Sequence, residues 1–227
     1  PRIMVLIQDV TEFTQKTYQL LLLREISLVM QGVVERDKLL HLILTCVTAG
    51  FAIGFNRAFL FLVDDSRTIL QGTLGVGPSS YDEAYRIWNE LSHDKHTFDD
   101  YIEKFNRGDL PQSTLQDLVE SIRFDLDEDN NVLTETVRSK NYFHVLNAWD
   151  DSRVDESLKH LLASKEFVTI PLIAKNQVIG VLMADNAYSG RNISLDSIEV
   201  LTMLGGSAAL AIENAKMLQV LEEKIAE

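Results

Sequence analysis

Residues 167–186 read FVTIPLIAKNQVIGVLMADN, and this stretch decides the fold. Two runs rich in β-branched and aliphatic residues, FVTIPLIAK and VIGVLMADN, lie on either side of a short polar turn at residues 175–177. This pattern is typical of a β-hairpin. A long stretch of helical composition begins at Ser194 and contains GGSAALAIENAKML at residues 205–218. We therefore predict two paired strands followed by one long helix that is rich in small residues.

The rest of the chain alternates helical and strand patterns. Apolar residues at helical spacing, a second β-rich pair around the turn Asp64-Asp65-Ser66, and helix start signals define the other elements. Working towards the N-terminus and then back, we predict helices at residues 18–34, 37–52, 132–139 and 152–162, and strands at residues 57–63, 68–76 and 142–146.

Residues 77–131 are too many for an ordinary loop, so they should contain structure of their own. Three short amphipathic patterns fit this segment, and they start near Tyr81, Phe98 and Leu115. We interpret the segment as a helical insertion that forms a lid. The complete order of strands with helices gathered before and after them favours an α+β fold, in which a mostly antiparallel central sheet is covered by helices.

Two longer segments carry a family resemblance. NAWDDSRVDESLKHLLASKEFVTIPL at residues 147–172 is similar to the Asp-rich turn, short helix and strand of GAF domains. VIGVLMADN, then Ser-Leu-Asp at residues 194–196 and AALAIENAKM at residues 208–217, resemble the last strand and C-terminal helix of that family. The resemblance implies a GAF-like (profilin-like) fold over residues 14–221, with residues 222–227 beginning a connecting signalling helix.

The first residues resemble a different family. RIMVLIQDVTE at residues 2–12 is similar to the last strand and exit motif of PAS domains, and Asp9, Val10, Thr11 and Glu12 match that motif. A strand at a terminus needs a partner for its backbone groups. We therefore expect residues 1–13 to be the exit strand and linker of a preceding PAS-like domain.

Composition narrows the partners and the compartment. The 227 residues carry a formal charge of −13, which repels the phosphate backbone, so we expect no nucleic-acid binding. Cys46 is the only cysteine, and it lies in an apolar helical pattern, so we expect a buried thiol in a reducing, cytoplasmic compartment. No apolar run or signal peptide predicts a membrane span. We expect a soluble segment without direct membrane contact.

Several residues are candidates for a small-molecule site beneath the lid. Aromatic side chains on the first hairpin, in the lid and in the Asp-rich turn could line a cavity, together with residues of two later strands. The candidates are Phe59, Phe61, Trp88, Tyr142, His144, Trp149 and Thr169. The alternative for each is plain packing, and a packed strand histidine is the alternative for His144.

Specific ligands and reactions find little support. The Asn-Lys-Phe-Asp-Glu pattern of cyclic-nucleotide-binding GAF domains is not found, and no cysteine near the lid could hold a bilin. His93, His96 and Asp99 are better explained as a solvated linker than as a metal site. The carboxylates of DLDEDNN at residues 125–131 lack the Gly that a calcium loop requires, because Asn130 occupies its position. We expect no metal site and no catalytic residues, and the cofactor remains unknown.

The terminal helices predict self-association. Leu201, Leu204, Ala208, Ala211, Ala215, Leu218 and Ile225 approximate a heptad stripe. Gly205, Gly206, Ala208 and Ala209 would allow another helix to approach closely, and residues 18–34 are apolar on nearly all sides. We expect a parallel homodimer through the terminal helices, although packing of one face on the sheet alone would also explain the pattern.

The resemblance implies that the segment is a sensory or regulatory module. GAF domains of this type lie upstream of a histidine kinase, nucleotide cyclase, phosphodiesterase or transcriptional activator, and we expect a sensor histidine kinase of a two-component system. The alternative is a ligand-free structural dimerisation spacer. A free-standing sulfoxide reductase of GAF fold would need reactive cysteines, and Cys46 alone argues against it.

Overall fold

The centre of the structure, a computed structural model, is a six-stranded antiparallel sheet in the order β3-β2-β1-β6-β5-β4. It describes residues 11–50, 52–93, 98–107, 114–162 and 164–226. The expected strand at residues 2–10 lies outside these ranges, so a preceding PAS-like domain stays a prediction. The strands are β1 (Arg57–Val63), β2 (Ile69–Val76), β3 (Arg123–Asp125), β4 (Phe143–Val145), β5 (Phe167–Ala174) and β6 (Gln177–Asp185).

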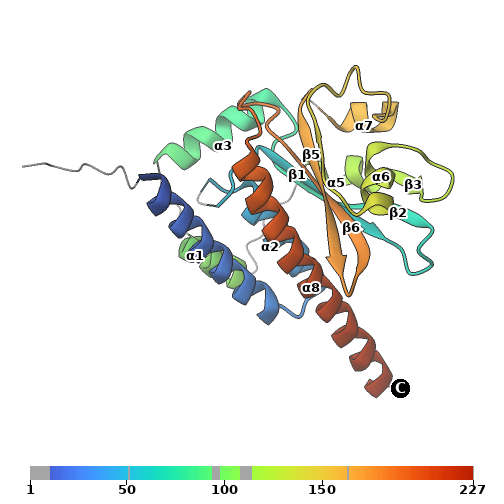
Figure 1. Cartoon of the computed structure of the whole chain (residues 1–227). Helices are drawn as coiled ribbons and strands as arrows, with labels where there is room; N and C mark the ends of the chain where they lie inside the picture. The colour runs from blue at the N-terminus through green and yellow to red at the C-terminus, as the bar shows by residue number, and fades with distance from the viewer. Residues whose placement is uncertain (1–10, 51, 94–97, 108–113, 163, 227) are drawn as a thin grey trace, which may run out of the picture.

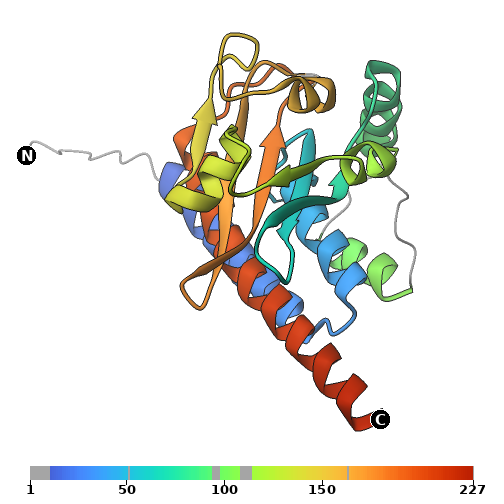
Figure 2. The same cartoon turned by 90° about the vertical axis from the view of Figure 1, so that its right-hand side faces the viewer.

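Eight helices in the described part of the chain surround this sheet. They are α1 (Thr11–Gly32), α2 (Arg36–Thr48), α3 (Tyr81–His93), α4 (Phe98–Arg107), α5 (Gln116–Glu120), α6 (Val132–Ser139), α7 (Glu156–Leu161) and α8 (Leu195–Ala226). In Figure 1, α1, α2 and α8 lie on one side of the sheet, and α5, α6 and α7 lie on the other. Figure 2 shows the same layers from the side, with α8 projecting beyond them at the C-terminal end. The predicted α+β class and GAF-like architecture are confirmed.

Alternating side chains give the sheet two separate cores, because successive residues of a strand point to opposite faces. The helix-side core packs against α1, α2 and α8; strand residues in it include Leu60, Ile170 and Leu182. The cap-side core packs against α5, α6 and α7; strand residues in it include Phe59 and Met183. Both faces of the central strands are therefore dry, which explains why β1 reads as an almost unbroken apolar run.

The turns follow from local chemistry. Lys175 and Asn176 both have positive φ, 47° and 65°, and Ala174 pairs with Gln177, so the hairpin that opened the sequence argument closes through a two-residue turn. In the first hairpin, the Asp64 carboxylate accepts hydrogen bonds from the backbone N–H groups of Thr68 and Ile69, both at 2.9 Å.

The cap helices start at identifiable caps. The Asn131 side chain accepts hydrogen bonds from the backbone N–H groups of Leu133 and Thr134, and the Thr134 hydroxyl accepts one from the N–H of Asn131, which completes a capping box for α6. The Asp155 carboxylate accepts the N–H of Leu158 at 2.9 Å. Helix α7 thus begins at Glu156, four residues later than the sequence pattern predicted.

The insertion at residues 77–131 divides between the two faces. Phe105 of α4 lies in the helix-side core, whereas Leu115, Val119 and Ile122 lie in the cap-side core. A Cβ atom at Gly72 of β2 would overlap the backbone of Val119, so a glycine is needed there for α5 to approach the strand. The insertion also adds the edge strand β3, which the sequence analysis missed. The predicted single lid is therefore two separate covers.

The heptad stripe predicted for self-association belongs to the core. Leu201, Leu204, Ala208, Ala211 and Ala215 are buried in the helix-side core, where α8 packs on β5. A different side of α8 carries exposed apolar residues, namely Met203, Leu210 and Met217. The apolar pattern of α8 was correctly recognised but assigned to the wrong neighbour, because a helix packed on a sheet shows the same repeat as one packed on a partner helix.

Helix α1 is buried on one side only. Leu22, Leu23, Ile26 and Met30 lie in the helix-side core, while Leu20, Leu21 and Leu28 are exposed. Figure 1 shows that α1 and α8 run in the same direction, and Ser27 donates a hydrogen bond to the Ser207 hydroxyl at 2.9 Å. The second apolar side of α1 therefore has no cover within the described part of this chain.

Helix α8 also meets a membrane-span criterion that the sequence analysis did not anticipate. The window Leu195–Ile225 is long enough and has a mean hydropathy of 1.4, but 44% of it is buried inside the fold. Core helices of soluble proteins pass the same test. The absence of direct membrane contact stays a prediction.

Helix α4 covers a polar stripe on α2. His41 lies on this stripe, and among the described residues its Nδ1 atom is buried without a hydrogen-bond partner. Burial lowers the pKa of His41 below 6.5, and the nearby Asp37 carboxylate opposes this shift. Tyr101 of α4 lies in the same seam, where burial raises its pKa to about 12. The seam therefore favours neutral side chains.

We expect stability to fall in mild acid through His41. The unfolded chain binds a proton at this imidazole more readily than the folded protein does, so the stabilisation from neutral His41 is fully present above pH 6.5 and is lost as the pH falls through the lower, folded-state pKa. Urea unfolding at pH 7.5, 6.5 and 5.5 measures this loss. In His41→Leu the decline should be shallower, whereas His160→Gln, at an exposed position, should behave like the unsubstituted protein. Parallel curves for the unsubstituted protein and His41→Leu would contradict the assignment.

Candidate functional site

The candidate site is the cap-side face of the sheet, beneath α5, α6 and α7. Phe59 and Phe61 from β1 and Thr169 from β5 all lie there, and each is completely buried. The Thr169 hydroxyl is 2.8 Å from that of Thr136, which also donates to the carbonyl of Val132 at 2.7 Å. The structure thus brings together three of the seven candidates, and it places them in a packed interior.

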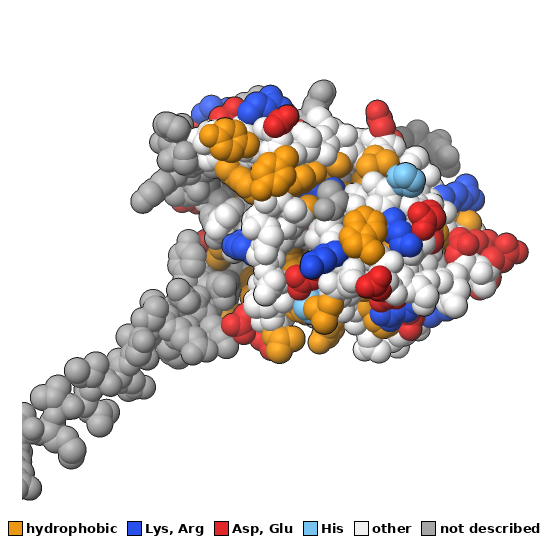
Figure 3. Space-filling view, turned by 90° about the horizontal axis from the view of Figure 1, so that it is seen from above, with side chains coloured by type: hydrophobic (Ala, Val, Ile, Leu, Met, Phe, Trp, Pro, Cys, Tyr) orange, Lys and Arg blue, Asp and Glu red, His pale blue; other side chains and the backbone are white. Residues whose placement is uncertain are grey.

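Three other candidates lie apart from this interior. Trp88 on α3, Tyr142 before β4 and Trp149 after β4 are all exposed. Figure 3 shows the molecule from above, with a hydrophobic patch over α3 at the upper left and further hydrophobic side chains scattered among charged ones. Tyr81, Tyr85 and Trp88 account for the exposed aromatic residues of α3. These side chains do not join Phe59 and Phe61 in one cavity.

His144 has a partner of a different kind. Its Nε2 atom is 2.8 Å from Oε1 of Glu166, and the same oxygen accepts the backbone N–H of Ile193 at 3.2 Å. Its neighbours Phe143 and Val145 pack with the cap-side core, so the alternation of the strand turns His144 away from that core. His144 therefore ties the edge strand β4 to the segment just before α8. For all seven residues, ligand binding stays a prediction.

Sequence reasoning missed the most buried charges of the site. Arg57 begins β1 and Asp185 ends β6, and the two residues face each other in the register of the paired strands. Arg57 Nε donates to Asp185 Oδ1 at 3.1 Å, and Nη2 donates to Oδ2 at 2.6 Å. Both side chains are almost completely buried, with exposed fractions of 2% and 0%. A bidentate pair of this kind satisfies two charges that the interior would otherwise penalise.

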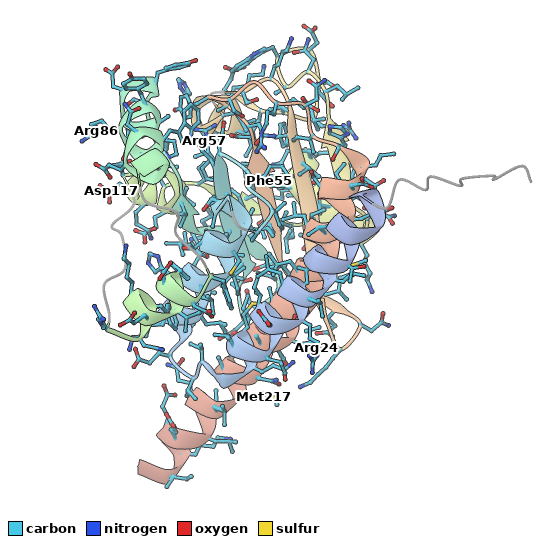
Figure 4. The ribbon with its side chains drawn as sticks, turned by 90° about the vertical axis from the view of Figure 1, so that its left-hand side faces the viewer. Arg24, Phe55, Arg57, Arg86, Asp117 and Met217 are labelled. Atoms are coloured by element: carbon cyan, nitrogen blue, oxygen red, sulfur yellow. The ribbon has the colours of Figure 1, made fainter. Side chains whose placement is uncertain are left out.

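This pair also joins several elements at one end of the sheet. Arg57 Nη1 donates to the carbonyl of Leu161 at the end of α7, at 3.1 Å. Its guanidinium lies 5.1 Å from the ring centre of Phe59 and 5.7 Å from that of Tyr188. Burial raises the pKa of Tyr188, and its ring meets Tyr81 of α3 edge-on at 5.8 Å. Figure 4 shows Arg57 between the sheet and α3. A signal in the sequence did exist, since Arg57 and Asp185 interrupt two otherwise apolar strands.

The geometry supports packing and relay more than chemistry. Among the described residues, no group of three or more His, Cys, Asp or Glu side chains could hold a metal ion. In the acidic segment, Asp125 Oδ1 accepts the N–H groups of Asp127 and Glu128, so this carboxylate serves its own turn. His96 lies outside the described residues. Cys46 is buried, as predicted, and burial raises its pKa to about 12, so the thiol is a poor nucleophile.

Removing one member of the buried pair should destabilise the protein strongly. Arg57→Ala leaves the Asp185 carboxylate buried without its cation, and the expected loss is about 3–5 kcal/mol in the free energy of unfolding. Guanidinium chloride unfolding at neutral pH measures the loss. Lys38→Ala, which breaks the exposed pair with Glu35, is the control and should cost less than about 1 kcal/mol. Equal losses in the two variants would show that the buried pair does not organise this end of the sheet.

Comparison with known proteins supports one family. A family model for the GAF domain matches residues 41–212. A search of curated protein sequences found no significant match. Among solved structures, the GAF domain of a phosphoenolpyruvate-protein phosphotransferase from Coxiella burnetii is similar with a TM-score of 0.62 and 14% identity, over 90% of this chain and 98% of that one.

Two further structures extend the comparison. Residues 122 to 287 of a methyl-accepting chemotaxis protein are similar with a TM-score of 0.58 and 18% identity, over 85% of this chain and 98% of that one. Free methionine-R-sulfoxide reductase from Neisseria meningitidis, solved with its substrate, is similar with a TM-score of 0.55 and 15% identity, over 86% and 89% of the two chains. At these identities, the likeness concerns the fold alone. The match to the family model covers most of the chain, and the chain therefore belongs to the GAF domain family, whose members are regulatory and sensory modules.

Proposed function

We propose that this segment relays a conformational state through its terminal helices to a downstream output domain, which we propose is a histidine kinase. The observation that carries the proposal is the course of α8. This helix packs on β5, and then continues past Met217 as an exposed rod to its last described turn. Figure 4 shows α1 lying along α8 and the end of α8 beyond Met217 without cover from another element.

The last anchored turn of α8 is held by both hairpin turns. Lys175 from the β5–β6 turn lies 3.3 Å from the Glu213 carboxylate and 3.1 Å from the Met217 sulfur. Asp65 from the β1–β2 turn pairs with Lys216. At the opposite end of the sheet, Glu166 accepts the N–H of Ile193 just before α8. A shift of the strands would therefore move α8 at both ends of its packed portion.

Small-molecule sensing at the cap-side face has less support than relay. Phe59, Phe61, Phe167 and Met183 are completely buried there, so side chains of the protein already fill the space beside the sheet. This packing favours a signal that arrives from a neighbouring domain. It also keeps open the alternative of a ligand-free dimerisation spacer.

The setting of the module is part of the same proposal. The residues Asp9, Val10, Thr11 and Glu12 support a preceding PAS-like domain, and the similarity in fold to part of a chemotaxis protein supports a signalling context. We further propose a cytoplasmic location and a parallel homodimer that forms through the exposed sides of α1 and α8. Signals can pass along such helices when the two states differ in the pose of the helices.

Native mass spectrometry tests for a ligand. For the purified segment, we expect only the mass of the polypeptide and its oligomer, because the cap-side core is filled. A co-purifying small molecule that is lost in Phe61→Trp, which overfills this core, would contradict the ligand-free reading and favour sensing. Leu146→Trp is the matched control, since Leu146 is exposed.

Insertions within the exposed part of α8 test the relay in the full-length protein. Two alanines after Glu223 rotate everything downstream by roughly half a turn, whereas seven residues restore the phase to within about 20°. We expect autophosphorylation to change at least about threefold with two residues and to stay near the original rate with seven, an effect well below 1 kcal/mol.

The outcomes separate the possible functions. Equal activity in both insertion variants would favour the spacer. No autophosphorylation in the unsubstituted full-length protein would contradict the kinase assignment. It would leave the relay to be tested on the output activity that the protein does have.

A further inference from the structure

A single apolar stripe runs along the outer side of α8. Met203, Leu210 and Met217 repeat at intervals of seven residues, and Leu221 continues the same side one turn later. Their exposed fractions are 52%, 52%, 43% and 55%. A repeat of seven keeps side chains on one side of a helix. We call these four residues and Gly206 between them the outer stripe.

Gly206 is the unexpected member of the outer stripe. Its neighbour Gly205 faces the sheet, where an added Cβ would lie 3.2 Å from Cγ2 of Ile170. An added Cβ at Gly206 would meet nothing within 4 Å. Glycine inside a helix is less favourable than alanine, so the fold of one chain gives no reason for glycine at this position. Close approach of a second backbone would give one.

The outer stripe continues into the free end of α8. Leu218, Leu221 and Ile225 are exposed by 43%, 55% and 83% and follow coiled-coil spacing. Beside the stripe, α1 presents Leu20, Leu21 and Leu28, and the Ser27–Ser207 hydrogen bond joins the two helices. The apolar surface is therefore one continuous strip over two parallel helices.

The strip is large enough for a stable interface. Covering the exposed apolar side chains of α1 and α8 would bury roughly 800 Å² per protomer, which is about the amount that a standard protein interface buries on each partner. The residues counted are Leu20, Leu21, Leu28, Met203, Leu210, Met217, Leu218, Leu221 and Ile225.

We propose that the occupant is a second copy of this chain, packed in parallel, with the two α8 helices in contact along the outer stripe and closest at Gly206. The proposal rests on the homodimer of the proposed function and fixes its axis. Only the parallel arrangement buries Leu218, Leu221 and Ile225 against their own copies. In an antiparallel pair that crosses at Gly206, the free end of α8 would lie beside the start of the other α8, and Leu221 would be far from its copy.

Substitutions at Gly206 test the closest approach, with the dimer dissociation constant measured by sedimentation equilibrium. Gly206→Leu should raise the constant at least about tenfold, which corresponds to ~1.4 kcal/mol. Gly206→Ala should weaken the dimer less, and should raise the melting temperature at concentrations where the protein is monomeric. Glu223→Leu adds the same side chain to the opposite side of α8 and should leave the constant unchanged. A dimer unaffected by Gly206→Leu would overturn the proposal, as would an unsubstituted protein that stays monomeric.

Disulfide trapping tests the parallel direction. Cys46 is buried with a raised pKa, so single-cysteine additions can be made in the unsubstituted background. Gly206→Cys and Leu221→Cys should each form a covalent dimer rapidly under mild oxidation, and Glu223→Cys should do so slowly. Trapping at Gly206→Cys but not at Leu221→Cys would indicate an antiparallel pair and overturn the proposal, as would rates equal to that of Glu223→Cys at both positions.

Failure of this inference and failure of the proposed function give different results. If the outer stripe is not the seam but the insertion variants still differ in activity, the relay stands and the protein associates through another surface. If the seam is found but both insertion variants are equally active, the module is a dimerisation spacer with the axis described above.

Discussion

The pairing of β1 with β6 at the centre of the sheet, dry on both faces, is the constraint on which the rest of the structure depends. Each strand sends alternate side chains into two different cores, so helices must cover both sides. The ladder ends at Arg57 and Asp185, whose buried ion pair also holds the end of α7 through the carbonyl of Leu161. The central strands thus determine where the covering helices can lie.

This arrangement also separates the two sides of the molecule by role. The cap-side core is closed by short helices and by aromatic residues such as Phe59 and Phe61. The helix-side core is closed by α1, α2 and α8, of which α1 and α8 keep an exposed apolar side. A site for association and relay on the helix side agrees with this distribution, since exposed apolar surface of this extent is uncommon on a protein without a partner.

Several parts of the candidate site were predictable, and others were not. The positions of Phe59, Phe61 and Thr169 on strands follow from β-rich runs, so their burial could be anticipated. The Arg57–Asp185 pair joins residues 128 positions apart, and only strand register brings them together. His144 was expected beside a pocket, but the alternation of a three-residue strand turned it towards Glu166. Short edge strands offer too few residues for their facing side to be read from a pattern.

The sequence by itself determined the elements that local chemistry controls: the hairpin at residues 167–186, the cap at Asp155, the acidic turn before α6, the burial of Cys46 and the α+β class. These follow from periodicity, turn residues and caps, which act over a few residues. Only the tertiary structure decided which apolar stripe of α8 faces the sheet, and how the insertion divides between two faces. Both depend on contacts between distant segments, and an apolar repeat records that a side chain needs cover without recording which surface provides it.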